Sequence, residues 1–231
     1  MKRLILFDID GTLLSTNGAA RRAFERALLE VYGTAGPIDT HQFDGKTDPQ
    51  IARELLTAAG LSNEAIDVAL PDLFDQYLRA MAHEVAQPGH VTHVYPGVHT
   101  VLAALAARAD VLLGLLTGNI AEGAALKLRS AHLHDYFEFG AFGSDCERRD
   151  ELPAIAVQRA LQRTGAHFRG KDVIVIGDTP SDVRCGQSLG VFALGVCTGR
   201  HSRQVLLAEG ADVVLDDLAD TNRVLDILTA A

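Results

Sequence analysis

The chain opens with its most informative hydrophobic pattern. Residues 4–9 are apolar except for Asp8, and Asp10, Gly11 and Thr12 follow directly. A short apolar run that ends at a turn signal predicts a strand buried on both faces. Asp8 then lies at the end of this strand, and Asp10 lies in the turn after it. Two carboxylates in such a place repel each other and lose hydration, so a cation, hydrogen bonds or a proton must compensate them.

A helical stretch follows this strand. The spacing of apolar residues predicts helices over 18–32, 49–59 and 62–86. Pro71 is expected to interrupt the third helix, and the turn-rich segment 33–48 is expected to be a loop. No strong strand pattern lies between 15 and 87. We therefore expect residues 15–90 to form a small helical domain inserted after the first strand.

From Pro96 onward, apolar runs alternate with amphipathic segments. Strands are predicted at 111–116, 173–176, 191–196 and 211–215, with a short one within 136–143. Helices are predicted at 97–108, 120–131, 152–164, 180–189, 203–209 and 218–228. Strands that alternate with helices indicate an α/β fold with a doubly wound parallel sheet. Residues 1–14 and 91–231 are expected to form this core domain.

Composition and charge narrow the class of protein. The 231 residues are 48% hydrophobic, with 21 basic against 30 acidic residues and a net charge of −9. This balance argues against nucleic acid or an anionic membrane as the main partner. The three cysteines show no CxxC spacing, which favours reduced thiols, and no run approaches the roughly 20 apolar residues of a membrane span. We expect a cytoplasmic protein, and the pattern leaves open whether it is a monomer or a homodimer.

Polar residues follow the apolar runs at the points where three predicted strands end. These residues are Asp8 and Asp10, Thr117 and Asn119 around Gly118, and Asp178 and Asp182. In open α/β sheets ligands bind at the carboxyl ends of the strands, so these side chains are expected to meet at one edge. Hard oxygen ligands suit Mg²⁺, and the ion would let several carboxylates stay ionised together. A neighbouring pair of carboxylates then provides a nucleophile and an acid/base.

Other side chains near these ends suit an anionic substrate. Thr117 and the amides beside Gly118 are candidates to hold phosphoryl oxygens. Arg148 or Arg149 would neutralise a transferring phosphoryl group. Simpler interpretations stay open: Asn119 is expected to cap the helix over 120–131, and Asp182 fits a capping box.

The order of these motifs resembles the haloacid dehalogenase superfamily. The segments are Asp8-Ile9-Asp10-Gly11-Thr12, Thr117-Gly118-Asn119, a basic residue, and Gly177-Asp178-Thr179-Pro180-Ser181-Asp182. The inserted helices resemble the helical cap of this superfamily, whose core is Rossmann-like. The resemblance implies Asp8 as nucleophile, Asp10 as general acid/base and Thr117 as a phosphate ligand. It also implies Mg²⁺ held by Asp8, Asp178 and the Asp10 carbonyl, with Asp182 in support.

One motif departs from the family pattern. The third motif usually contains a lysine ahead of a proline-containing helix, whereas Arg148 and Arg149 precede Pro153 here. We assign the role to Arg149 and keep Arg148 as the alternative; an arginine presents a planar fork rather than a point charge. In the insertion, Gly45, Lys46 and Thr47 are either a plain helix entry or a cap loop that meets the substrate.

The resulting hypothesis is a Mg²⁺-dependent phosphatase of a small phosphorylated metabolite, resembling phosphoglycolate phosphatases. The insertion would close over the site, exclude water and select the substrate. Three alternatives stay open: a phosphomutase of the same fold, a 2-haloacid dehalogenase, and a non-catalytic binding module that keeps a decayed site.

Overall fold

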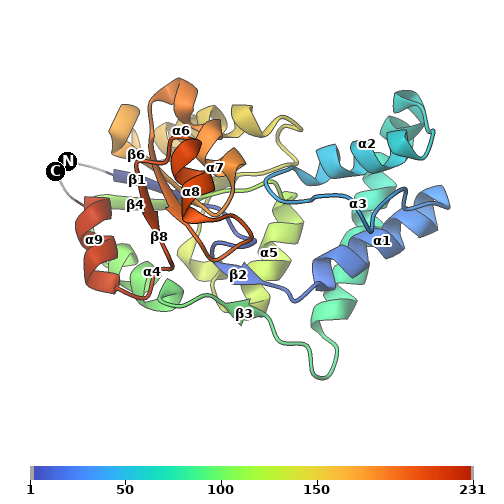
Figure 1. Ribbon diagram of the computed structural model, residues 1–231, viewed down its shortest axis with the longest axis horizontal. Coiled ribbons are helices and arrows are strands. Elements are labelled where there is room, and N and C mark those ends of the chain that lie inside the picture. The colour runs from blue at the N-terminus through green and yellow to red at the C-terminus, as the bar shows by residue number, and fades with distance from the viewer. Residues whose placement is uncertain (1–2, 230–231) are drawn as a thin grey trace.

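The computed structural model describes residues 3–229, with a parallel sheet at its centre (Figure 1). Six strands lie in the order β5-β4-β1-β6-β7-β8, and every neighbouring pair is parallel. They are β1 (Arg3–Phe7), β4 (Val111–Leu116), β5 (Gly140–Ala141), β6 (Val173–Gly177), β7 (Phe192–Val196) and β8 (Val213–Leu215). Because the chain winds outward from β1 in both directions, the predicted doubly wound α/β fold is confirmed.

Helices cover both faces of the sheet. They are α4 (Val98–Ala106), α5 (Ala121–Ser130), α6 (Leu152–Thr164), α7 (Pro180–Cys185), α8 (Arg203–Ala208) and α9 (Thr221–Thr229), with single 3₁₀ turns at His134–Tyr136, Arg149–Glu151, Gly170–Asp172 and Gln187–Leu189. Ile5 and Phe7 of β1 pack toward α4, α5 and α9, whereas Leu4 and Leu6 pack toward α6. This alternation is why β1 reads as a continuous apolar run.

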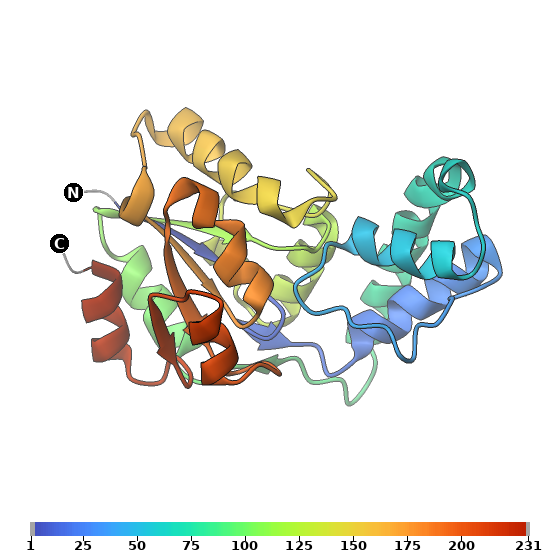
Figure 2. The same ribbon diagram turned by 45° about the horizontal axis from the view of Figure 1, so that its top comes forward.

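Three further helices form a separate lobe around their own apolar cluster (Figure 2). They are α1 (Ala19–Tyr32), α2 (Asp48–Ala58) and α3 (Asn63–Val85). Phe24 of α1 stacks edge-on against Tyr77 of α3, and Leu55 of α2 is fully buried in the same cluster. The start of β1 and the helix α9 lie at the far side of the core from this lobe (Figure 1). The proposed domain boundaries at 14/15 and 90/91 stay a prediction, and residues 1–2 and 230–231 of the expected core lie outside the described part.

A short antiparallel ribbon joins the two lobes. Strand β2 (Leu14–Ser15) leaves the core, and β3 (His93–Val94) returns to it and pairs with β2. No separate strand was predicted at either place, because two-residue strands have no readable period. The pairing ties both connections together at one point, next to the turn that carries Asp10.

Two helix predictions need correction. Helix α3 runs through Pro71 without a break, although an internal proline costs about 3 kcal/mol. The packing of Ile66, Leu73 and Tyr77 in the apolar cluster offsets this cost. The helix predicted over 180–189 ends at Cys185, and a 3₁₀ turn follows.

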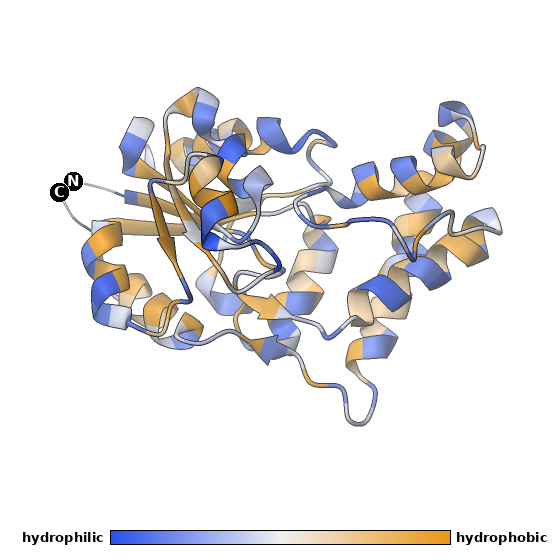
Figure 3. Cartoon of the chain, viewed as in Figure 1, coloured by the Kyte–Doolittle hydropathy of each residue, from blue (hydrophilic) through white to orange (hydrophobic). Residues whose placement is uncertain are grey.

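The distribution of hydropathy agrees with this layered arrangement. In Figure 3 the strands are largely apolar, whereas the helices carry alternating polar and apolar stripes. Within residues 3–229 no helix combines the length and the apolar character that a membrane crossing requires.

The apolar cluster of the helical lobe predicts a specific stability difference. Leu55→Ala should lower the free energy of unfolding by about 2–5 kcal/mol, because it leaves a cavity between α2 and α3. Leu29→Ala, on the half-exposed side of α1, is the matched control and should change it by less than about 0.5 kcal/mol. Urea unfolding followed by circular dichroism measures both. Equal effects of the two substitutions would contradict the conclusion that Leu55 belongs to the core of the helical lobe.

Candidate active site

Three carboxylates from two strand ends lie together at the carboxyl edge of the sheet. Asp8 follows β1, and its amide donates to the Ile176 carbonyl of β6 (2.9 Å). Asp178 and Asp182 follow β6, and oxygen atoms of all three carboxylates lie within 4.8 Å of one another. Gly11 has φ +84°, and a Cβ there would lie 2.4 Å from Asp178 Oδ2. Only glycine therefore lets the turn after β1 approach Asp178 this closely.

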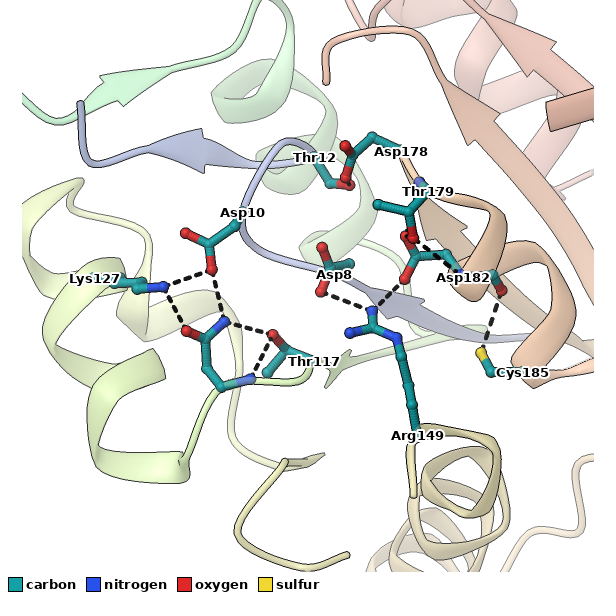
Figure 4. A network of polar contacts seen from close by, with 11 residues as sticks. Asp8, Asp10, Thr12, Thr117, Lys127, Arg149, Asp178, Thr179, Asp182 and Cys185 are labelled. Atoms are coloured by element: carbon teal, nitrogen blue, oxygen red, sulfur yellow. Dashed lines mark hydrogen bonds and ion pairs between the residues drawn. The ribbon is translucent and has the colours of Figure 1, made fainter. Parts of the chain in front are cut away.

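Arg149 reaches this cluster from the turn before α6. It is 8% exposed, and its Nη2 lies 3.1 Å from Asp8 Oδ1 and also pairs with Asp182 Oδ1 (Figure 4). Arg148, in contrast, points to solvent and pairs with Asp150 and Glu151. Of the two arginines that the sequence left open, Arg149 is the one in the site. Its buried Nε has no hydrogen-bond partner among the described residues.

Asp10 lies apart from the cluster and has a cation of its own. Lys127 of α5 places Nζ 2.6 Å from Asp10 Oδ2, and Asn119 Nδ2 donates to the same oxygen at 2.8 Å (Figure 4). Lys127 was not among the site residues predicted from the sequence. The helical period could have indicated it, because Lys127 lies on the same buried face of α5 as Ala124 and Leu128.

Burial changes the titration of the cluster. Loss of hydration, followed by the neighbouring Asp182 carboxylate, raises the pKa of Asp8 to about 7 even though Arg149 opposes the shift. Burial, and then Asp182 and Asp8, raise the pKa of Asp178 well above its usual range. The only side-chain hydrogen bond that Asp178 accepts within the described residues comes from Thr12 Oγ1 (3.2 Å). Asp8 and Asp178 are thus under-compensated by the protein itself.

The loop after β4 is organised by Asn119. Its side chain bonds to Asp10, accepts from Lys127 Nζ (2.5 Å), and donates to Thr117 Oγ1 (2.7 Å). The prediction that Asn119 caps the next helix was therefore wrong: no side-chain cap is present at Ile120, the residue that precedes α5. Charged neighbours outcompete the helix terminus for its amide. Thr117 Oγ1 accepts from Asn119 twice, so its own hydrogen is available to a ligand.

Asp182 has the structural role that its sequence context suggested. It forms a capping box with Thr179: Asp182 Oδ2 accepts from the Thr179 amide (3.0 Å) and hydroxyl (2.7 Å). Its other oxygen faces Arg149. A contribution of Asp182 to metal binding stays a prediction, as does the role of the Asp10 carbonyl.

Comparison with known proteins agrees with this geometry. Residues 5–196 match the model of the haloacid dehalogenase-like hydrolase family. The chain belongs to this family.

Individual relatives cover nearly the whole chain. A phosphoglycolate phosphatase of Yersinia pestis is 28% identical, and the match covers 94% of this chain and 90% of the relative. A phosphoglycolate phosphatase of Pseudomonas putida is 26% identical, and the match covers 94% of this chain and 78% of the relative. A hydrolase structure from Pseudomonas syringae superposes with a TM-score of 0.73 at 20% identity, covering all of both chains. The predicted enzyme class, a phosphatase of the haloacid dehalogenase-like family, is thereby confirmed.

In this hydrolase the loop before α2 contacts the core directly. Gly118 is a close-approach position, because a Cβ there would lie 2.0 Å from the Lys46 carbonyl. Thr47 caps α2 by accepting from the Gln50 amide, and its hydroxyl donates to the Glu147 carbonyl (2.7 Å). Lys46 pairs with Glu54 of α2. Thr47 is thus a helix cap, as the simpler interpretation held, and it also links the two lobes.

Asp48 is a second residue of this region that was not predicted from the sequence. Its carboxylate accepts from the Ile120 amide at the start of α5 (2.8 Å), and its own amide donates to the Gly118 carbonyl (2.8 Å). Burial raises the pKa of Asp48 to about 6. A residue of the insertion therefore supplies the acceptor that Asn119 was expected to provide, which joins the insertion to α5.

A cavity of about 320 Å³ lies between the two lobes of the hydrolase. Asp8, Asp10, Thr117 and Lys127 line it from the core, and Arg21, Phe24, Lys46 and Tyr77 from the insertion. Its volume matches pockets for small ligands. A larger, open groove beside α2 contains neither Asp8 nor Asp10, so the smaller cavity is the candidate active site.

Proposed function

We propose that the hydrolase is a Mg²⁺-dependent phosphatase of a small phosphorylated metabolite, and that it acts through an aspartyl phosphate on Asp8. The charge balance at the strand ends carries this proposal. Four carboxylates, Asp8, Asp10, Asp178 and Asp182, lie at these strand ends together with two buried cations, Lys127 and Arg149. An excess of two negative charges remains among these described groups, and one divalent cation balances it.

The donor set fits Mg²⁺. The three clustered carboxylates offer hard oxygen atoms, and no imidazole or thiolate belongs to the cluster within the described residues. Asp8 and Asp178 would hold the ion, since the oxygens of Asp182 already face Thr179 and Arg149. When bound, Mg²⁺ supplies positive charge that keeps Asp8 ionised and attracts the phosphoryl group.

Asp8 and Asp10 have different roles in the two half-reactions. In the first, an Asp8 oxygen attacks phosphorus, the bond to the leaving oxygen breaks, and the carboxylic acid of Asp10 donates a proton to that oxygen. In the second, the Asp10 carboxylate takes a proton from water, whose oxygen attacks the phosphoryl group and restores Asp8. Thr117, the amides of Gly118 and Asn119, and Arg149 are proposed to hold the phosphoryl oxygens.

The insertion is proposed to act as a cap that selects the substrate. Gly45, Lys46 and Thr47 lie in the loop that meets the core, and Lys46 lines the cavity. Arg53 of α2 places Nε 2.9 and 3.0 Å from the two oxygens of Glu147, two residues before Arg149. This pair holds the cap against the loop that delivers Arg149. The small cavity and the phosphoglycolate phosphatases among the relatives support a small metabolite as substrate.

Removal of the nucleophile tests the proposal. Asp8→Asn should lower kcat by at least roughly 1,000-fold, because the amide cannot attack phosphorus. Asp10→Asn should lower it about 10²- to 10⁴-fold, and Asp135→Asn, on the exposed surface, is the control. The assay is phosphate release from a panel of small phosphate esters with Mg²⁺ present. Full activity of Asp8→Asn would overturn the proposal, and sugar phosphate isomerised without phosphate release would identify a phosphomutase.

Metal binding should depend on pH. Because folding raises the pKa of Asp8 from near 4 to about 7, its protonated form stabilises the metal-free fold, and this stability is lost as the pH rises through that window. Mg²⁺ requires the ionised carboxylates, so it should raise Tm more at about pH 8 than at about pH 6. Calorimetry suits this measurement, since the chain has no tryptophan. Asp178→Asn should abolish the difference, and an equal Mg²⁺ effect at both pH values would contradict this site.

The Arg53–Glu147 pair predicts a modest effect on substrate binding. Glu147→Gln should raise KM roughly two- to fivefold and leave kcat nearly unchanged, because a partly exposed ion pair contributes about 0.2–1 kcal/mol. Asp67→Asn is the matched control: it removes the partner of Arg53 on α3 and leaves the bridge to the core intact. A rise in KM that is the same in both variants would show that the bridge does not hold the cap.

A further inference from the structure

Lys127 is a buried cation that the proposed chemistry does not yet use. Its side chain is 5% exposed, yet it places Nζ 2.6 Å from Asp10 Oδ2 and 2.5 Å from Asn119 Oδ1. Burial alone would lower the pKa of Lys127, but the nearby Asp10 carboxylate more than compensates, and the net pKa is raised. Lys127 is therefore a charged donor. Burying a lysine ammonium group costs free energy, because the group loses its hydration and needs a partner in place of water.

The hydrogen bonds of Asp10 are asymmetric. Lys127 Nζ and Asn119 Nδ2 both donate to Oδ2, whereas no described residue donates to Oδ1. In Figure 4 the contact between Lys127 and Asp10 runs to one oxygen of the carboxylate. One oxygen is held while the other stays free for proton exchange.

Asp10 needs such support for two reasons. The terminal torsion of an aspartate is broad, so its carboxylate orientation has no strong intrinsic preference. In addition, its side chain is 44% exposed, and packing does not hold it. The donors are themselves fixed. Lys127 is buried on α5, and the Ile120 amide at the start of this helix donates to the Asp48 carboxylate. The Asn119 amide group donates to Thr117 Oγ1.

We propose that Lys127 is a positioning residue for the general acid/base: with Asn119 it holds Oδ2 of Asp10 and so aims Oδ1 at the leaving group and at the attacking water. The inference rests on the proposed role of Asp10. Lys127 acts through Asp10 and does not itself contact phosphorus. Both half-reactions depend on the aim of Oδ1, because the same oxygen first donates a proton and then accepts one.

The test compares two single substitutions on α5, one of the buried lysine and one of an exposed arginine. Lys127→Met removes the buried charge but keeps similar length, and Arg129→Met removes one positive charge from the exposed side of α5. With phosphoglycolate, or the alkyl phosphate that the wild type hydrolyses fastest, Lys127→Met should lower kcat about 10- to 100-fold with little change in KM. Arg129→Met should stay within about twofold of the wild type.

A second substrate separates positioning from a merely structural role. The leaving group of para-nitrophenyl phosphate departs without a proton, so attack by Asp8 should stay fast in Lys127→Met, whereas activation of water becomes slow. Stopped-flow measurement should then show a burst of nitrophenolate close to the enzyme concentration. Should Lys127→Met fail to fold by circular dichroism, Lys127→Gln takes its place under the same criteria.

Two results would overturn this inference. Wild-type kcat in the Lys127 variant would show that Asp10 is aimed without it. An equal loss on both substrates with no burst would show that Lys127 only supports the fold. The proposed function fails separately, if the wild type releases phosphate from no ester in the panel.

Discussion

The architecture of this hydrolase depends on how it compensates buried negative charge at the end of β1. Asp8 is buried, and the charge of Asp10 two residues away adds to the repulsion that it must bear. The structure gives each its own cation: Arg149 reaches Asp8 from one side of β1, and Lys127 reaches Asp10 from the other. The charge that remains is concentrated around Asp178, where hard oxygen ligands gather. Separate compensation lets two neighbouring carboxylates take different roles.

The fold delivers these cations from elements that also contact the cap. Lys127 lies on α5, and Asp48 of the cap accepts a hydrogen bond from the amide at the start of this helix. Arg149 follows Glu147, whose carbonyl and carboxylate accept hydrogen bonds from Thr47 and Arg53 of the cap. Seating of the cap and placement of both cations are therefore physically linked. Close approach at Gly118 makes this contact possible, since any side chain there would displace the cap loop. The insertion is thus part of the electrostatic frame as well as a cover for the cavity.

Much of this site could be predicted from the sequence, because parallel strands bring their carboxyl ends to one edge. That rule alone placed Asp8 beside Asp178. It does not predict which cation, distant in sequence, pairs with Asp8 or with Asp10. Lys127 belongs to a helix whose period shows only that its face is buried, and the choice between Arg149 and its neighbour depends on the path of one turn. Asn119 was misjudged for the same reason, since its local context favours a cap while Asp10 and Lys127 are distant in sequence.

The most direct test of this account is the identity of the phosphorylated atom. Asp10→Asn should slow hydrolysis of the intermediate, so mixing it with para-nitrophenyl phosphate and Mg²⁺, followed by acid quench and peptide mass spectrometry, should trap one phosphoryl group. We expect this group on Asp8. Turnover without phosphorylation of Asp8, or a phosphoryl group on any other residue, would contradict it.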